Sequence, residues 1–348
     1  MSSISIAPSG ALSQTSPTVR QFRWVLLLTA CLVAAGGLVY VTERYVLRFE
    51  RRFAENPVEI MMRAFAMAHF TLGWLFLLTS PKIRSFKAIL RLAITASVGL
   101  ILCLVFAKFG SLSNPLLALF FYGYFLVHEV RDEAVIYQAY GDAPQLTPLG
   151  RRALNALSRS VCISLMGLLL LVYLLHVAIT GKSGLENCPR TLMLGLGVLL
   201  LIACTWSWRQ TWLLGISEHG DARSFILAHA PLWWVYLGIA AVLLVGSLLG
   251  ATGINLVIVI HVASWLVFVH YQLGTQRCGT VTGPWIWLRR TPTGFLTLHV
   301  AVFLGFLILL AVRVYVWQRV GVVSQFLASD TFCYWSLMHI SMAFWSSK

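Results

Sequence analysis

Long apolar runs separated by short polar connections extend along the chain from residue 24 onward. Nine of these runs are close to the roughly 20 residues that an α-helix needs to cross the hydrocarbon core of a bilayer. They cover residues 24–41, 60–79, 88–107, 113–130, 159–179, 190–208, 231–250, 253–271 and 294–317. A tenth run, residues 331–345, has only about 15 residues, a length that suits a short span, a re-entrant segment or an interfacial helix. The pattern predicts an all-α fold, a polytopic integral membrane bundle of about nine or ten transmembrane helices.

Composition agrees with this pattern and excludes several classes of protein. Hydrophobic residues make up 59% of the chain and charged residues 11%, under half of the roughly 25% found in soluble domains. A soluble globular enzyme, a fibrous protein and a disordered chain are therefore excluded. Residues 1–20 are rich in Ser, Pro and Thr, and we expect them to form a disordered polar tail. Residues 21–348 are predicted to form a single transmembrane helical domain.

The formal net charge of +14 comes from basic residues scattered between the apolar runs, not from one basic domain. No nucleic-acid partner is therefore expected, and the partner that the charges indicate is the lipid bilayer. With the N-terminus inside, the inner connections hold 16 Lys and Arg residues and the outer connections hold 10. This bias predicts an integral protein of a bacterial inner membrane with a cytoplasmic N-terminus.

The histidines of the apolar runs fall at two predicted depths in the membrane. One set lies near the middle of its runs and contains His69, His261 and His339. A second set lies near the cytoplasmic ends of the runs and contains His128, His270 and His299. Ionisable side chains inside a bilayer are costly, so these histidines are candidates for a functional site. The alternative is that each neutral imidazole forms an ordinary hydrogen bond to a neighbouring helix.

The densest group of polar residues is the segment HEVRDE at residues 128–133, which ends the fourth apolar run. On a helix, His128 and Asp132 share one face, and Glu129 and Glu133 share another. This spacing lets an imidazole and carboxylate oxygens converge on a divalent cation, although the second histidine of an HExxH motif is absent. We expect Glu129 or Asp132 to act as a hard metal ligand or as a general base. The alternative is a solvated helix end in which Arg131 pairs with a carboxylate.

The two histidines of the eighth run have a fixed relation if that run is helical. Nine residues at about 100° each place His261 and His270 on opposite faces, about 13.5 Å apart along the axis. They cannot bind one metal ion together. We expect His261 to converge with His69 and His339 at mid-depth. His270 is expected to behave differently, with His128 and His299 as its neighbours at the inner boundary.

Together these residues indicate a multi-pass membrane metalloprotein. The candidate metal ligands are His69, His128, Asp132, His261, His270, His299 and His339, and the candidate catalytic groups are Glu129 and Asp132. We expect a non-haem iron oxidoreductase, or one with another metal, acting on a hydrophobic small molecule such as a lipid, an isoprenoid or a quinone. Zinc and haem b are the alternative cofactors, and haem held between two histidines would make an electron-transfer protein. A proton-coupled secondary transporter and an accessory subunit of a membrane complex are further alternatives.

Overall fold

The computed structural model of the chain describes residues 31, 34–48, 55–78, 85–140, 146–180, 190–248, 256–275, 287, 291–316, 325 and 327–344. Within these ranges all regular elements are helices, which confirms the predicted all-α fold. The longer helices are α2 (Pro57–Leu78), α3 (Phe86–Phe109), α4 (Pro115–Tyr140), α5 (Pro148–Thr180), α6 (Arg190–His219), α8 (Ala230–Leu248), α10 (Leu256–Thr275), α12 (Pro292–Ala311) and α14 (Ser329–Ala343). The predicted polar tail, residues 1–20, and much of the first apolar run lie outside the described residues.

Several helices continue well beyond the apolar runs that predicted them. α5 begins eleven residues before its run, and α6 ends eleven residues after its run. Five helices are long and apolar enough to cross a membrane: α2, α3, α5, α6 and α12 extended by η6 (Val312–Val316). The short helix α7 (Ala222–Ala228) meets α8 at 82°, and the pair is a sixth span if it is counted as one broken helix. The described chain is therefore a helical membrane bundle that crosses the bilayer several times.

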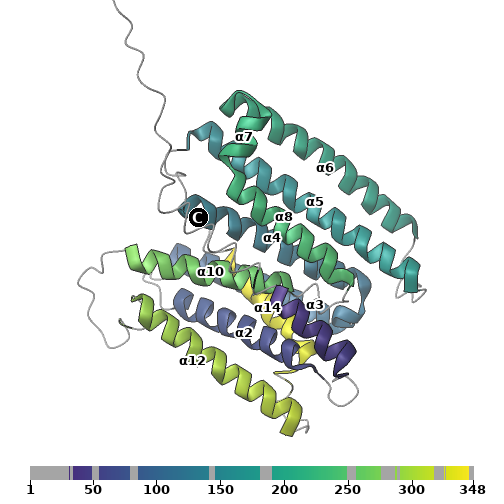
Figure 1. Ribbon diagram of the computed structural model, residues 1–348, viewed down its shortest axis with the longest axis vertical. Helices are drawn as coiled ribbons and strands as arrows, with labels where there is room; N and C mark the ends of the chain where they lie inside the picture. Colours follow the sequence, from purple (N-terminus) through teal and green to yellow (C-terminus); the bar gives the residue numbers. More distant parts are fainter. Residues whose placement is uncertain are drawn as a thin grey trace, which may run out of the picture.

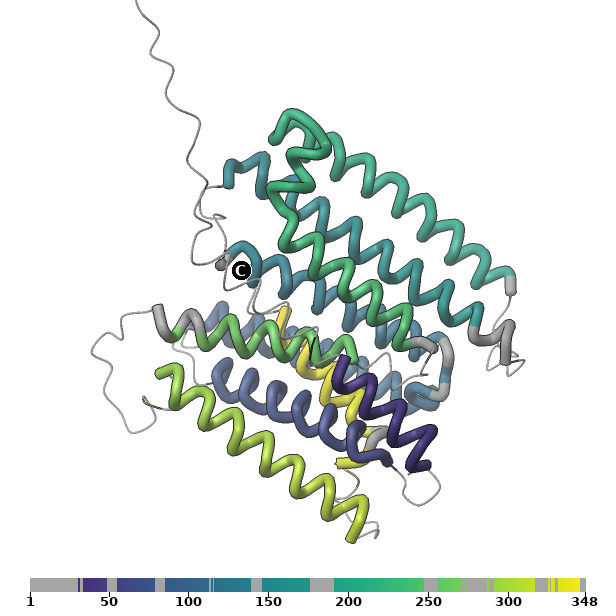
Figure 2. Tube along the Cα trace, in the orientation of Figure 1, coloured from purple at the N-terminus to yellow at the C-terminus, as the bar shows by residue number. Residues whose placement is uncertain are grey.

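The helices lie side by side in a row (Figure 1). α6 and α12 are at opposite ends of the row, and α2, α4, α10 and α14 lie between them. Figure 2 shows α14, in yellow, in the middle of the molecule. In the most apolar stretch of α2, 56% of the residues are buried, against 11% in α3 and α6 and 17% in α12. The peripheral helices thus present apolar side chains outward, as lipid requires, whereas α2 is enclosed by the rest of the bundle.

One buried ion-pair cluster holds the first half of α2 against the start of η6. Arg63 of α2 pairs with Glu55, and both side chains are buried. Arg313 of η6 donates a hydrogen bond to the same carboxylate, with 3.0 Å between Nη1 and Oε1. A carboxylate that accepts from two guanidinium groups fixes the positions of both helices more firmly than a single exposed pair would.

Two glycines let α14 pack closely against α2 and α3. A Cβ at Gly99 of α3 would lie 2.8 Å from Sδ and 3.3 Å from Cα of Met338, so a larger residue there would push α14 away. A Cβ at Gly73 of α2 would lie 3.3 Å from Cε1 of His339. Small residues at helix contacts allow this close approach in membrane bundles. The consequence is that His339 lies directly against α2.

Candidate metal centre

Four helices that are distant in the sequence bring one histidine each to the same point in the bundle. These are His69 of α2, His128 of α4, His261 of α10 and His339 of α14, and we call them the histidine cluster. All four side chains are buried. The distances between ring centroids are 5.1 Å for His69–His261, 4.6 Å for His128–His261, 5.4 Å for His128–His339 and 4.8 Å for His69–His339. The rings therefore form a closed four-membered circuit with each imidazole beside two others.

The donor atoms of this region fall into two groups that could each hold a metal ion. The first group is His69, His261 and His339, and the second is His128, Asp132 and His261. Within each group the donor atoms all lie within 4.8 Å of one another. Metal–nitrogen bonds of about 2.0–2.1 Å place the donors of one ion roughly 3–3.5 Å apart in tetrahedral geometry, so small side-chain adjustments would complete either group.

Carboxylates border the histidine cluster on the side of α4. Asp132 lies 3.5 Å from His128, measured between Oδ2 and Nδ1, one helical turn further along the same face. Glu129 lies 3.1 Å from His261, measured between Oε2 and Nδ1. Glu129 and Glu133 are both fully buried. A solvated helix end would expose them, so this alternative is wrong for these two carboxylates.

Arg131 pairs with a carboxylate, as expected for a solvated helix end, but it does so only at the edge of the site. Its guanidinium lies 3.5 Å from Asp132 and donates a hydrogen bond of 3.0 Å to the carbonyl oxygen of Ala343, the last residue of α14. Phe344 stacks beneath the same guanidinium, with 4.4 Å between the Cζ atom and the ring centroid. Arg131 therefore joins α4 to the end of α14 and places positive charge beside only one of the three carboxylates.

The histidine cluster does not satisfy its own hydrogen-bonding groups. In the described part of the chain, both ring nitrogens of His69, His128 and His261 and the Nε2 atom of His339 are buried without a hydrogen-bond partner. A buried polar atom without a partner costs about 1–3 kcal/mol, and more than nine in ten buried polar groups in proteins avoid this cost. Ordinary interhelical hydrogen bonds would have used these nitrogens. Each neutral imidazole therefore has one ring-nitrogen lone pair available for another ligand, which is the property that a metal site requires.

The structure separates the two remaining candidate histidines from the histidine cluster. His270 is exposed near the end of α10, on the helix face opposite His261. His299 of α12 is buried against Phe295, with 4.5 Å between ring centroids. Trp265 lies between His299 and the cluster, 5.4 Å from the His299 ring and 4.4 Å from the His69 ring. The side chain of Trp265 therefore separates His299 from the histidine cluster.

The expectation that His128 lies at a separate inner level with His270 and His299 is wrong. His128 lies beside His261 and His339, in the mid-depth group. The expected depth was counted from Val130, where the apolar run ends, on the assumption that the polar segment after it reaches solvent. α4 instead remains buried through Glu133, Ala134 and Ile136, so His128 lies deeper than the end of its apolar run indicates.

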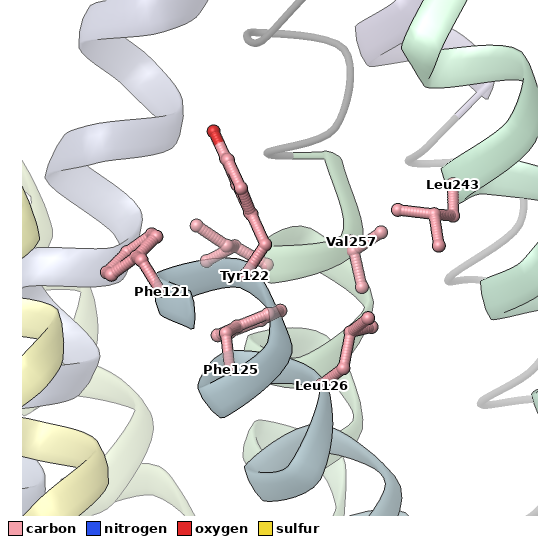
Figure 3. Close-up of a pocket in the computed structure, with 7 residues that line it drawn as sticks. Phe121, Tyr122, Phe125, Leu126, Leu243 and Val257 are labelled. Carbon is pink, nitrogen blue, oxygen red and sulfur yellow. The ribbon is translucent and has the colours of Figure 1, made fainter. Parts of the chain in front are cut away.

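An apolar crevice lies next to the histidine cluster, between α4, α8 and α10 (Figure 3). It is lined by Phe121, Tyr122, Phe125, Leu126, Leu243, Val257 and Ile258. Phe125 joins the crevice to the cluster, because its ring centroid is 6.3 Å from that of His261. The free volume of the crevice is about 10 Å³, which is near the minimum for one water molecule. The crevice is thus a narrow apolar seam that reaches the site, not an open cavity.

Sequence reasoning gave too little weight to Glu133 and did not find Trp265. Glu133 is as deeply buried as Glu129 and follows it by four residues on the same face of α4. That spacing was visible in the sequence, but its burial was not. Trp265 follows His261 by four residues on α10, so the same helical periodicity would have placed it over the site.

The fold and the site together define a class: a multi-pass helical membrane protein with buried histidine groups that could bind metal. Comparison with family models, with curated proteins and with solved structures gives no match. The function therefore has to be inferred from the chemistry of the site.

Proposed function

We propose that the histidine cluster and the carboxylates of α4 bind iron, and that the protein is a membrane oxidoreductase acting on a hydrophobic substrate. The observation that carries this proposal is the set of buried imidazole nitrogens without hydrogen-bond partners. The donors are imidazoles and carboxylates, a combination that suits iron, with zinc and manganese as the nearest competitors. More than four donors converge, which exceeds what a structural tetrahedral zinc site needs.

The surroundings of the site support redox chemistry on an apolar molecule. Bound iron would supply electron transfer or activation of oxygen within a region from which packed side chains exclude water. Glu129 and Asp132 lie close enough to the imidazoles to act as a metal ligand or to accept a proton from the substrate. The seam beside His261 is lined without charged groups, so it would have to widen to admit a lipid, an isoprenoid or a quinone tail, but the tail would then meet an apolar wall.

The haem alternative receives less support from the geometry. Two axial histidines must face each other across a porphyrin plane, with open space on all sides between them. His69 and His261 are 5.1 Å apart between centroids, but Trp265 and His339 lie within 5 Å of the same His69 ring. His270 and His299 do not form an axial pair either, since His270 is exposed and His299 is buried behind Trp265.

Metal analysis of the purified protein tests the proposal. The protein in mild detergent is reconstituted with Fe²⁺ without oxygen and desalted, and iron is measured by mass spectrometry beside a visible spectrum. We expect bound iron and no Soret band in the wild type, and loss of iron in His261→Ala. The matched control is His270→Ala, an exposed histidine on the same helix, which should keep its iron. A Soret band would favour haem, and a wild-type protein that binds no metal would contradict the proposal.

A further inference from the structure

We propose that the site is dinuclear and that the imidazole ring of His261 bridges two metal ions. This inference rests on the proposed function and states how many ions the site holds and how they are joined. The two groups of donors share one residue, His261, while His69 and His339 belong only to the first group and His128 and Asp132 only to the second. If a metal ion occupies each group, His261 is a ligand of both ions. One ring nitrogen binds one ion, so the two ions require both nitrogens of His261.

The orientation of His261 makes both nitrogens available. Its Nδ1 atom lies 3.1 Å from Oε2 of Glu129, which places that edge of the ring on the carboxylate side. Its Nε2 atom is buried without a hydrogen-bond partner in the described part of the chain. The ring also lies between two others, with centroids 5.1 Å from His69 and 4.6 Å from His128. A metal ion on each edge of His261 would thus have a second imidazole within reach.

The buried charge agrees better with two ions than with one. Asp132, Glu129 and Glu133 supply up to three negative charges beside the cluster. A bridging imidazole is deprotonated at both nitrogens and supplies a fourth, because binding of the second ion displaces the remaining ring proton to solvent. Two divalent cations bring four positive charges. One divalent cation would leave carboxylates uncompensated or protonated in a region of low dielectric constant, where isolated charge is costly.

Counting bound Zn²⁺ tests the number of ions without reference to any reaction. Zn²⁺ accepts the same imidazole and carboxylate donors and has no redox chemistry. Each protein is saturated with Zn²⁺, desalted and analysed for zinc and protein. We expect two Zn²⁺ per chain in the wild type and in the control His270→Ala. His69→Ala and His128→Ala should each retain one, and the double variant should retain none.

The pattern across these variants separates the two proposals. In one outcome the wild type binds one Zn²⁺ and each single variant binds none. That outcome would overturn the dinuclear site but would still support a metal site. A wild type that binds none would overturn both. Two Zn²⁺ retained in both single variants would mean binding elsewhere and would also overturn the inference. Size-exclusion profiles and helical circular dichroism identify any variant that has failed to fold.

Electron paramagnetic resonance of the Cu²⁺ form tests the bridge itself. Two Cu²⁺ ions joined through one imidazole couple their spins, so the signal at low temperature should integrate to well under the amount of copper bound. A signal equal to the bound copper would overturn the bridge. In His69→Ala, which is expected to keep only the ion of the second group, signal and bound copper should agree.

Discussion

Two clusters of buried polar side chains lie between helices of this bundle, and they differ in how they treat their hydrogen-bonding groups. Between α5 and α6, Ser160 Oγ lies 2.7 Å from Ser207 Oγ and 2.8 Å from Thr211 Oγ1. Further along the same interface, Nε1 of Trp208 donates to Ser164 Oγ at 2.9 Å. Every one of these side chains has a partner. In the histidine cluster, by contrast, seven ring nitrogens across four residues have no hydrogen-bond partner in the described chain.

This difference in hydrogen bonding indicates a different role for each cluster. Hydroxyl groups that bond to one another hold two helices together and need nothing further, which is a common arrangement in membrane proteins. Imidazoles that meet without bonding add cost to the folded state, and such cost persists where a function requires it. The α5–α6 network therefore needs no ligand, whereas the histidine cluster has unused donors that could hold a metal ion. Changes in each should affect stability and metal binding in opposite ways.

The largest expected effect is that of removing the metal. An ion present at about 1,000 times its dissociation constant stabilises the folded protein by roughly 4 kcal/mol, because it binds the assembled site and not the separated helices. Chelation of the iron-loaded protein should therefore lower its melting temperature by several degrees, as measured by thermal unfolding in detergent. His261→Ala, already without metal, should show no response to the chelator. An equal response in both proteins would contradict the assignment of the stabilising ion to this site.

A smaller effect of opposite sign is expected from His69→Leu in the metal-free protein. Leucine removes two buried nitrogens that have no hydrogen-bond partner and is close to histidine in size. The metal-free variant should be more stable than the metal-free wild type by about 1–3 kcal/mol, the cost of an unsatisfied buried polar group. The same variant should gain less from added metal than the wild type does. Destabilisation of the metal-free form would show that His69 has a structural role.

The smallest effect is expected in the hydroxyl network. Ser160→Ala removes the hydrogen bonds to Ser207 and Thr211, and interhelical hydrogen bonds in membranes contribute about 0.6 kcal/mol on average and up to roughly 1.7 kcal/mol. The variant should lose stability by that amount and keep its full metal content. Ser217→Ala, an exposed hydroxyl on α6 bonded only to its own helix, is the matched control and should change neither. Loss of metal in Ser160→Ala would remove the distinction between the two clusters.

The sequence predicted the helices well because a helix that crosses lipid needs about 20 mostly apolar residues in a row, and such a run is visible in a single sequence. Each apolar run from residue 60 onward lies largely within a helix, since a backbone in hydrocarbon must satisfy its own hydrogen bonds. The ends were less predictable. α5 begins in a segment that alternates exposed polar residues with buried apolar ones such as Leu154 and Leu157, and the length of an apolar run does not report such one-sided packing.

Relations between site residues of the same helix could be predicted from the sequence. Contacts between site residues of different helices could not. The contact of His128 with Asp132 and the separation of His261 from His270 follow from helical periodicity alone. The meeting of His128 with His339 depends on how far α4 and α14 slide along each other, which is set by contacts such as those at Gly99. A single sequence contains no record of that offset. The contact of Glu129 with His261 joins α4 to α10, so it could not be predicted either.

The spread of the donors along the chain has a consequence for how the protein is made. His69 and His339 touch in the folded molecule but are separated by 270 residues, so α2 enters the membrane long before α14 has been synthesised. Until then, the group of His69, His261 and His339 lacks one of its three donors. In the proposed metal centre, the ion of this group would therefore be bound only after translation and insertion of α14. The group of His128, Asp132 and His261, on α4 and α10, would be complete earlier, so the two ions would be loaded one after the other.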